Sequence, residues 1–362
     1  MIRVGLIGYG YWGPNLFRNL VNSGSFEVVA IADTSETRRA AICQRDVSVR
    51  ALDTAEAVIA LSKIDAVVIA TPVATHYELA RQALENGKHV LIEKPMCASS
   101  DEAQHLVQLA RTLNRVLMVD HTFLFTGAVQ SIYGLVSHGD LGRIAYVDAM
   151  RVNLRPFQRD VNVLWDLGPH DLSIVDYILG EEPIHIEASG YCLANSSRAD
   201  MVYLTLHYPS RIVAHINLGW GSPVKVRRFA VGGSAKTIVW DDLSSQEKLK
   251  IYQTDPDSQS EEDWHVLMSE YRTSDIFSPR VPTHEALAGV VEHFAKVIAG
   301  QEHSIMDGCS GLRIIRILEA AQKALDESLA RVGDSSANRV RAGSSSSSAS
   351  EINAVGTQRR NI

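Results

Sequence analysis

The stretch RVGLIGYGYWGPN, residues 3–15, decides the fold. A short apolar run leads directly into Gly8, Gly10 and Gly13, which stand in the G-x-G-x-x-G spacing. By itself this spacing is common, and a glycine-rich turn without a ligand would show it too. Here the glycines follow a predicted strand and open a predicted helix, and an acidic residue ends the next predicted strand. This context predicts the first β-α-β unit of a dinucleotide-binding domain.

Each glycine of the motif has a separate physical task. Gly8 permits the tight turn, Gly10 lets the backbone approach a pyrophosphate, and Gly13 allows the helix to pack closely on the strand. The N-terminus of the helix favours the negative charge of the pyrophosphate. Three aromatic residues lie between these glycines and are expected beside the cofactor: Tyr9, Tyr11 and Trp12.

Asp33 ends the next predicted strand, twenty residues beyond Gly13. A carboxylate at this place accepts hydrogen bonds from the adenosine ribose hydroxyls and repels a 2′-phosphate. The expected cofactor is therefore NAD rather than NADP. Arg38 and Arg39 follow closely, and we expect them on the solvated face of the next helix.

Outward from this motif, the chain divides into three parts. Residues 1–120 alternate short β-branched runs with helical stretches, which predicts an α/β Rossmann domain with a doubly wound parallel sheet. Residues 121–332 contain alternating apolar and polar runs between helical stretches, which predicts an α+β domain with an open, mostly antiparallel sheet. Residues 333–362 are rich in serine and poor in apolar residues, so a disordered tail is expected there.

Composition excludes several classes of protein. The 362 residues are 46% hydrophobic, and the net charge of -7 with a pI near 6.0 argues against a nucleic-acid or anionic membrane partner. No apolar run reaches the length of a membrane span, and the one at the N-terminus is too short for a signal peptide. The four cysteines form no C-x-x-C pair, so neither a disulfide framework nor a metal site is expected. Free thiols favour a cytoplasmic location.

The stretch NVLWDLGPHD, residues 162–171, contains an acid and an imidazole four residues apart. Pro169 has its fixed φ and missing N–H where the first helical position tolerates them, so a helix is predicted to begin there. Asp166 would then precede the helix and His170 would lie in its first turn, where both could face one cleft. The alternative is that Asp166 caps the helix and His170 packs at its start.

Another predicted strand ends in Glu93, Lys94 and Pro95. Ligand groups of open α/β sheets gather at the carboxyl ends of the strands, so this lysine is a candidate cleft residue. Position alone also allows a surface lysine, because most lysines are exposed.

Taken together, the motifs resemble those of the glucose-fructose oxidoreductase and inositol dehydrogenase family, Gfo/Idh/MocA. The resemblance rests on G-x-G-x-x-G, ATPVATHYELA, EKPM and the D-x-x-x-H of WDLGPHDLSIVDYILG, in this order within residues 1–330. It implies the two-domain fold, NAD-dependent oxidation of a secondary alcohol, and a catalytic set of Lys94, Asp166 and His170. It also implies a cis bond between Lys94 and Pro95.

The chemistry of alcohol oxidation suits these three residue types. The nicotinamide accepts a hydride and a base accepts a proton. Histidine suits the role of the base, because its ordinary pKa lies near neutrality. His170 is therefore the expected general base, and the general acid in the reverse direction. Lys94 is expected to stabilise a developing alkoxide or to relay the proton, while Asp166 holds that end of the site.

Further residues are expected around this set. The resemblance implies these cofactor contacts in addition to the glycine-rich turn: Thr71, Pro72, His76, Glu93, Lys94 and Trp165. Three arginines in RVNLRPFQRDVN, residues 151–162, could bind an anionic substrate such as a nucleotide-sugar diphosphate or a uronate. A solvated strand and loop would look the same. The substrate contacts expected from this stretch are Arg155 and Asn162, with Arg151 and Arg159 nearby.

Within the family, NVLWDLGPHDLSI and DHTFLF most resemble the branch that oxidises UDP-N-acetylglucosamine-type nucleotide sugars at C3. A UDP-hexosamine or its uronate is therefore the expected substrate. The resemblance also implies a homodimer or homotetramer that pairs through the outer face of the open sheet.

Two alternatives stay open. An inositol or free-sugar dehydrogenase shares the chemistry, and this alternative gains if the arginine-rich stretch faces away from the cleft. A non-catalytic NAD-binding regulator shares the fold, because fold does not fix function. Such a regulator would have little reason to keep Lys94, Asp166 and His170 together.

Overall fold

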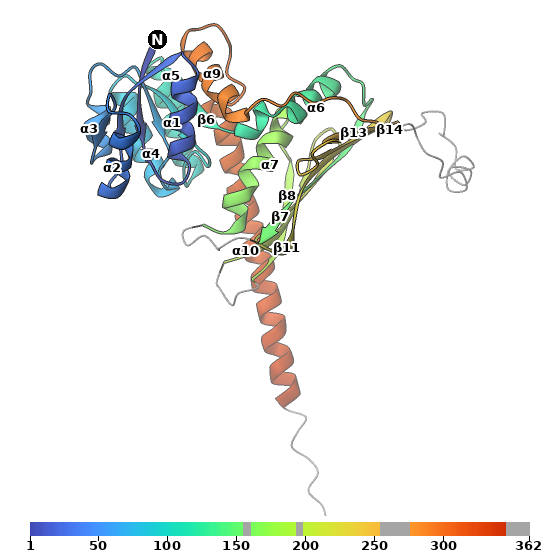
Figure 1. Ribbon diagram of the computed structural model, residues 1–362. Helices are drawn as coiled ribbons and strands as arrows, with labels where there is room; N and C mark the ends of the chain where they lie inside the picture. The colour runs from blue at the N-terminus through green and yellow to red at the C-terminus, as the bar shows by residue number, and fades with distance from the viewer. Residues whose placement is uncertain (155–160, 193–197, 254–275, 345–362) are drawn as a thin grey trace, which may run out of the picture.

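The computed structural model describes residues 1–154, 161–192, 198–253 and 276–344 of the chain. Two sheets organise these residues, one in each half of the chain (Figure 1). Within these ranges, no helix combines the length and the hydropathy needed to cross a membrane.

The first sheet has six parallel strands in the order β3-β2-β1-β4-β5-β6. Most of its strands are near-continuous apolar runs, as expected of a sheet buried on both faces. The strand order reverses between β1 and β4, and sheets of this kind bind ligands at the carboxyl ends of the strands beside such a reversal. The strands are β1 Ile2–Ile7, β2 Phe26–Ala32, β3 Arg50–Leu52, β4 Ala66–Ile69, β5 His89–Glu93 and β6 Leu117–Asp120. The helices between them are α1 Gly13–Asn22, α2 Glu36–Arg45, α3 Ala55–Ile59, α4 His76–Glu85 and α5 Ser100–Thr112.

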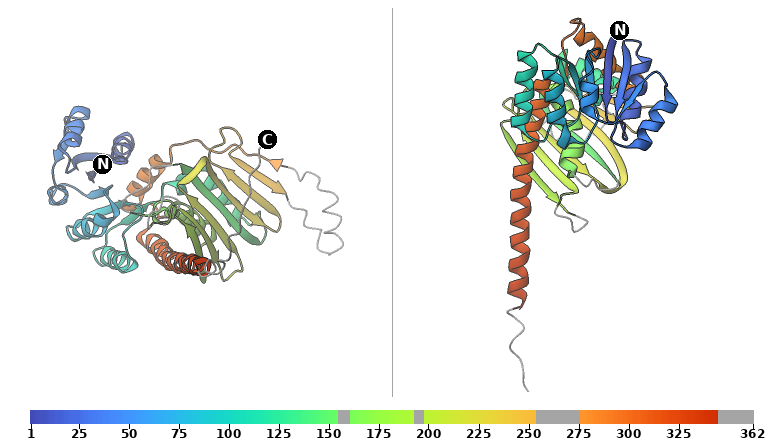
Figure 2. Two further views of the ribbon diagram at one scale, coloured as in Figure 1. Left: turned by 90° about the horizontal axis from the view of Figure 1, so that it is seen from below. Right: turned by 90° about the vertical axis from the view of Figure 1, so that its left-hand side faces the viewer.

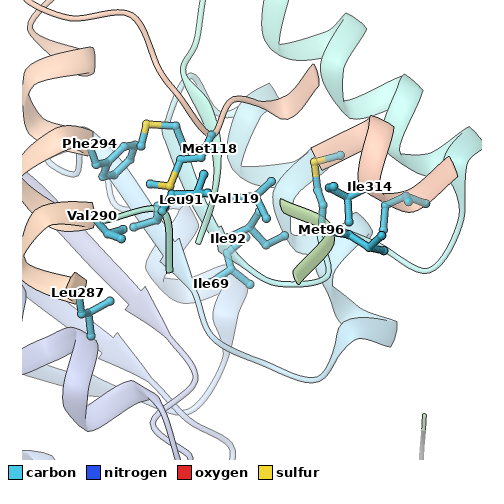
Figure 3. Close-up of a cluster of buried hydrophobic side chains, with 14 of the residues drawn as sticks. Ile69, Leu91, Ile92, Met96, Met118, Val119, Leu287, Val290, Phe294 and Ile314 are labelled. Atoms are coloured by element: carbon cyan, nitrogen blue, oxygen red, sulfur yellow. The ribbon is translucent and has the colours of Figure 1, made fainter. Parts of the chain in front are cut away.

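Helix α9 (Ala286–Ile298) returns to this first sheet from the far end of the chain. Its apolar face carries Leu287, Val290 and Phe294, which lie in one buried cluster with Met118 of β6 (Figure 3). The boundary predicted after residue 120 places α9 with the second sheet instead. The structure packs it on the first sheet because the apolar stripe of an amphipathic helix must find an apolar partner.

The second sheet has eight strands in the order β14-β13-β12-β11-β7-β10-β9-β8. Its described pairings are antiparallel except that of β7 with β10, so the predicted open, mostly antiparallel sheet is confirmed. The strands are β7 Ile144–Leu154, β8 His185–Tyr191, β9 Met201–His207, β10 Val213–Gly219, β11 Gly221–Gly233, β12 Lys236–Asp241, β13 Leu249–Gln253 and β14 Ile276–Phe277.

Helices α7 (Val163–Leu179) and α10 (Gly308–Ser344) cover one face of this second sheet, as both views in Figure 2 agree. Residues on β7 and β9 alternate between buried and exposed, which is the pattern of a sheet packed on one side only. Along the chain, the short helix η2 (Thr122–Phe125) and α6 (Gly127–Ser137) connect β6 to β7.

Helix α7 begins six residues earlier than predicted, so Pro169 lies inside it. Asn162 caps the helix, since its Oδ1 accepts a hydrogen bond from the N–H of Trp165, 3.2 Å away. This cap satisfies one of the unpaired N–H groups at the helix start, and it outweighs the signal of the proline. Asp166 therefore lies in the first turn of the helix rather than before it.

Helix α10 extends beyond its predicted end near residue 331. The expected disorder from residue 333 is wrong for residues 333–344, which are helical, while residues 345–362 lie outside the described residues. Once a helix is nucleated, each further residue adds a hydrogen bond at small cost, so Gly333 does not end it. In Figure 1 this helix runs from beside α7 to a point well beyond both sheets.

Candidate active site

The glycine-rich turn between β1 and α1 has the geometry that the motif predicts. Gly8 has a φ of 95°, which favours glycine, and a Cβ placed on it would lie 2.4 Å from the carbonyl oxygen of Ala70. A Cβ on Gly13 would lie 2.4 Å from the carbonyl oxygen of Gly8. At Gly10 a Cβ would approach only the guanidinium of Arg38, at 3.6 Å, so this side of the turn has room for a ligand close to the backbone.

The N-terminus of α1 suits an anion. The helix begins directly after the turn, no side chain of the described residues caps it, and its first turn holds no acidic residue. Unpaired N–H groups and the helix dipole both favour negative charge at such a terminus. The turn and the helix start therefore fit the pyrophosphate of a dinucleotide.

The aromatic residues of the turn differ in exposure. Tyr9 is buried and meets Phe17 edge-on, with 6.2 Å between the ring centroids, so its side chain belongs to the core. This differs from the prediction that Tyr9 lies beside the cofactor, because its ring packs on Phe17 of α1. Tyr11 is exposed and stacks on Trp12, at 6.4 Å between the centroids.

Asp33 stands after the end of β2, as predicted, and is buried. Its Oδ2 accepts a hydrogen bond from the N–H of Tyr9 and its Oδ1 one from the N–H of Ser35, both at 2.8 Å. Arg38 lies 3.4 Å from Oδ2, and Arg39 donates to the carbonyl oxygen of Asp33 at 2.9 Å. The two arginines thus bracket Asp33, whereas the sequence predicts them only on a solvated helix face.

The loop after β4 is held from within by His76. Its ring nitrogens lie 2.9 Å from the carbonyl oxygen of Pro95 and 2.7 Å from that of Thr71. The side chain is 1% exposed, so it joins the loops after β4 and β5 instead of lining the cofactor site as predicted. Thr71 is half-buried and Pro72 exposed, which leaves these two residues on the accessible side of the loop.

Lys94 reaches from the end of β5 to the first turn of α7, and its bond to Pro95 is cis, as the resemblance implies. Its Nζ donates to the carbonyl oxygen of Asp166 at 2.8 Å and lies 3.5 Å from Oδ1 of the same residue. The other carboxylate oxygen, Oδ2, accepts a hydrogen bond from the indole N–H of Trp220 at 3.1 Å. The side chains of Lys94 and Asp166 are 17% and 13% exposed. The structure therefore brings this predicted pair together.

His170 lies one helical turn beyond Asp166 on α7 and so projects from the same side of the helix. Its Nδ1 is covered and has no hydrogen-bond partner among the described residues, which leaves Nε2 as the accessible nitrogen. Burial, followed by the charge of Lys94, lowers the pKa of His170 well below its ordinary value of 6.5. The imidazole is therefore neutral at pH 7 and able to accept a proton.

A stack of side chains supports His170, and two of its members, Phe123 and Arg227, were not predicted from the sequence. The ring of Phe123 meets the imidazole edge-on, with 5.0 Å between the centroids. The guanidinium carbon of Arg151 lies 4.3 Å from the centroid of Phe123, and that of Arg227 lies 5.9 Å from it. Arg151 donates two hydrogen bonds, of 2.7 and 2.9 Å, to the carboxylate of Asp171. A buried ion pair thus fixes the aromatic ring that packs against the expected base.

The position of Arg151 changes the prediction for the arginine-rich stretch. The sequence allows Arg151 to bind an anionic substrate, but β7 alternates so that this residue faces inward and pairs with Asp171. Arg155 and Arg159 lie outside the described residues.

A cavity of about 440 Å³ opens beside Trp165, the neighbour of Asp166. Its polar lining comes from Asn162, Arg198, Gln322 and Asp326 as well as from the indole. Asn162 donates to Oε1 of Gln322 at 2.7 Å, so the predicted substrate residue does line the cavity, but its amide also joins α7 to α10. A cavity of this volume is in the range of small-molecule sites.

Two acidic residues end neighbouring strands close to Lys94. Glu93, expected beside the cofactor, ends β5, and its Oε2 accepts a hydrogen bond from the N–H of Lys94 at 3.2 Å. Asp120, which the sequence analysis did not single out, ends β6. The motif DHTFLF carries the signal that could have found Asp120, His121 and Phe123, because it follows a strand end just as EKPM does.

Two family models match the chain. Residues 2–121 match the one described as "Oxidoreductase family, NAD-binding Rossmann fold". Residues 134–332 match the one described as "Oxidoreductase family, C-terminal alpha/beta domain". The two matched segments correspond to the two sheets and together span most of the chain.

Individual relatives agree with this assignment. An uncharacterized oxidoreductase of Escherichia coli is 30% identical over 274 residues, covering 73% of this chain and 77% of its own. The UDP-N-acetylglucosamine 3-dehydrogenase of Acidithiobacillus ferrooxidans is 26% identical over 335 residues, covering 91% of this chain and 99% of its own. Its solved structure superposes with a TM-score of 0.77 at 25% identity, with the same coverage of both chains. The inositol 2-dehydrogenase of Rhizobium meliloti is 26% identical over 55% of this chain and 61% of its own.

The matched models, the order of the motifs and the geometry of the candidate site lead to one assignment. The glycine-rich turn fits a dinucleotide, and a lysine, an acid and a neutral histidine lie together at the carboxyl ends of the strands. The chain belongs to the Gfo/Idh/MocA family of oxidoreductases and is an NAD(P)-dependent dehydrogenase.

Proposed function

We propose that the protein oxidises the C3 hydroxyl of a nucleotide sugar, a UDP-hexosamine or its uronate, with NAD as the oxidant. The observation that carries the chemistry is the contact of Lys94 with Asp166, one helical turn from the neutral His170. The similarity to a UDP-N-acetylglucosamine 3-dehydrogenase over nearly the whole chain supports the substrate class.

When bound, NAD would supply the acceptor for the hydride, and the protein's own side chains move the proton. His170 takes the proton of the substrate hydroxyl, because its accessible nitrogen is unprotonated at neutral pH. Lys94 donates a hydrogen bond to the substrate oxygen and stabilises the negative charge that develops there. Asp166 holds the ammonium group, and the indole N–H of Trp220 in turn holds the carboxylate of Asp166.

The cavity beside Trp165 would take the part of the substrate that lies away from the reacting carbon. The guanidinium of Arg198 can pair with a phosphate or a carboxylate, and the indole of Trp165 offers an apolar wall for a ring. Arg198 therefore offers this cavity a positive charge from outside the arginine-rich stretch 151–162.

One observation favours a second candidate, an inositol or free-sugar dehydrogenase. Arg151 is buried and pairs with Asp171, so its charge is already satisfied within the protein and does not select an anionic substrate. Both candidates use the same Lys94, Asp166 and His170, and they differ only in what fills the cavity.

A substrate panel separates the two candidates. The purified protein with NAD is offered UDP-hexosamines and their uronates, inositols and free hexoses, and formation of reduced nicotinamide is followed by absorbance. Turnover confined to a UDP-sugar supports the proposal, whereas turnover confined to inositols or hexoses selects the second candidate. If the protein binds NAD in a fluorescence titration but oxidises no member of the panel, the regulator alternative replaces both.

The preference for NAD can be tested at Asp33. We expect Asp33→Ser to change the preference for NAD over NADP, measured as the ratio of their kcat/KM values, by roughly ten- to hundredfold in favour of NADP. This is the usual effect of losing a hydrogen bond between a carboxylate and the ribose. The change also releases Arg38 and Arg39, which bracket the carboxylate, to pair with a 2′-phosphate.

The double variant Asp33→Ser, Arg38→Ala is the matched control for this test. It should lose the gain with NADP while it keeps the loss with NAD. A ratio that does not change in the single variant would show that Asp33 does not select the cofactor.

The outer face of the second sheet is our proposed contact between copies of the chain, as a homodimer or homotetramer. Tyr146 and Met150 of β7 and Tyr203 of β9 are exposed on the side away from α7 and α10. Large apolar side chains gathered on one sheet face are typical of a surface that another subunit covers. The proposal of a cytoplasmic location rests on the four cysteines, which are free thiols.

A further inference from the structure

Two carboxyl groups meet behind Lys94. Glu93 and Asp120 are direct neighbours in the register of the parallel strands β5 and β6, so their backbones lie about 5 Å apart and their side chains leave the sheet on the same side. Asp120 is 2% exposed. Glu93 is half-buried, with its Oε1 covered. Two ionised carboxylates so close together and largely shielded from water would repel each other strongly.

One oxygen of each carboxyl group lacks a donor. Oε1 of Glu93 and Oδ2 of Asp120 are both covered, and neither receives a hydrogen bond of normal geometry from the described residues, although the indole of Trp12 lies near enough to Asp120 to favour its ionised form. A covered acceptor without a donor is costly, and two such acceptors on adjacent strands can satisfy each other only if a proton lies between them.

The remaining hydrogen bonds show which residue keeps the charge. Asp120 accepts a strong hydrogen bond from the hydroxyl of Thr122, at 2.6 Å, which stabilises its ionised form. Glu93 accepts only the N–H of Lys94, at the longer distance of 3.2 Å. Glu93 is therefore the better place for the proton.

We propose that Glu93 carries a proton and donates it in a hydrogen bond to the carboxylate of Asp120, so that the pair presents one negative charge behind Lys94. Both residues act through Lys94, and in this proposal they position and balance its charge without taking part in the reaction. The shared proton stands on the geometry alone, and only its effect on turnover rests on the proposed function.

The directions of the pKa shifts fit this assignment: burial raises the pKa of Asp120 too, but hydrogen bonds with Thr122, Glu93 and Trp12 oppose that rise. Burial, followed by the charge of Asp120, raises the pKa of Glu93 well above its ordinary value. Burial lowers the pKa of His121 to about 3, so this neighbour is neutral and supplies no countercharge. Lys94 is the charged group that acts on both carboxyls of the pair, and its charge also lowers the pKa of His121 and of His170.

The single charge matters for the ammonium group. With Asp166 already in contact, a second and a third carboxylate around Lys94 would hold it against the protein and weaken its hydrogen bond to a substrate oxygen. Protonation of Glu93 leaves the ammonium group more available to the oxygen on which charge develops.

Infrared spectroscopy of the full-length protein, with and without NAD and with no substrate, tests the shared proton directly. At pH 7 we expect a carbonyl stretch of a protonated carboxyl group, shifted in D₂O, that Glu93→Gln removes. If the wild-type protein shows no such band, or if the band survives in Glu93→Gln, the proposal is overturned. Because no substrate is used, this result stands even if the proposed function fails.

The conservative variants then separate positioning from structure. A glutamine at 93 keeps a donor toward Asp120, so we expect kcat in Glu93→Gln to exceed that in Glu93→Ala and in Asp120→Asn by about tenfold or more. The wild-type rate should also fall at alkaline pH, when Glu93 loses its proton above its raised pKa, and Glu93→Gln should lack this fall. If Asp120→Asn is the better tolerated variant, the proton belongs to Asp120 and the assignment is wrong.

Discussion

His170→Asn is expected to lower kcat by about 10²- to 10⁴-fold, the usual contribution of a positioned general base. Asparagine has a similar size and polarity but takes up no proton, so the substrate hydroxyl would lose its acceptor. The affinity for NAD should stay near that of the wild type, because the glycine-rich turn and Asp33 lie on β1, α1 and β2. Steady-state rates on the active substrate and a fluorescence titration of NAD give the two quantities.

A histidine far from the cleft provides the matched control. His185 lies at the exposed start of β8, at the edge of the second sheet, so His185→Asn should leave both quantities unchanged. A kcat in His170→Asn within a few fold of the wild type would remove His170 from the mechanism.

The pH profile gives an independent test of the same base. Burial and the charge of Lys94 lower the pKa of His170, so the imidazole becomes protonated only when the pH falls below that lowered value. Alcohol oxidation should therefore hold its rate through pH 6.5, with the acid limb at lower pH. The interpretation fails if kcat/KM already declines with a midpoint at or above pH 6.5 and His170→Asn abolishes that decline.

Asp171→Ala is expected to lower the free energy of unfolding by about 3–5 kcal/mol, the cost of leaving one partner of a buried ion pair alone. The side chains of Arg151 and Asp171 are 7% and 4% exposed and share two short hydrogen bonds. Without the carboxylate, the guanidinium stays buried above the ring of Phe123 and lacks a countercharge. Thermal and denaturant unfolding, each followed by two probes, measure the loss.

Two comparisons show whether burial of the charge is the cause. Glu85→Ala breaks an exposed ion pair with Arg81 on α4, and exposed pairs contribute only about 0–1 kcal/mol. The double variant Arg151→Met, Asp171→Leu removes both charges and should recover much of the stability. If Asp171→Ala costs no more than Glu85→Ala, the buried pair does not stabilise the fold as we describe.

Since Phe123 packs against His170, Asp171→Ala should also lower kcat.

Local patterns in the chain were enough to predict the two sheets. Strand residues such as Val67 and Val68 are β-branched and wholly apolar, which is the pattern of a buried parallel strand, whereas β7 and β9 alternate as a half-covered sheet requires. The glycine-rich turn could also be predicted. Gly8 and Gly13 must be glycine because a Cβ at either position would clash with backbone atoms of the same turn or of the residue after the adjacent strand. Helix ends were harder to predict. Asn162 favours a helix start at residue 163 and Pro169 favours one at residue 169, and the choice depends on which start has the lower free energy.

The sequence alone determined the class of fold, the nucleotide turn and the residue types available for catalysis, because these follow from periodicity and local backbone geometry. Only the tertiary structure decided which charges meet. Lys94 contacts Asp166, 72 positions away in the sequence. Arg151 pairs with Asp171 instead of a substrate anion, and Glu93 lies beside Asp120 of the neighbouring strand. Such contacts depend on how β5, β6, β7 and α7 pack in three dimensions. The pKa of His170 follows from the same packing, since burial and neighbouring cations set it.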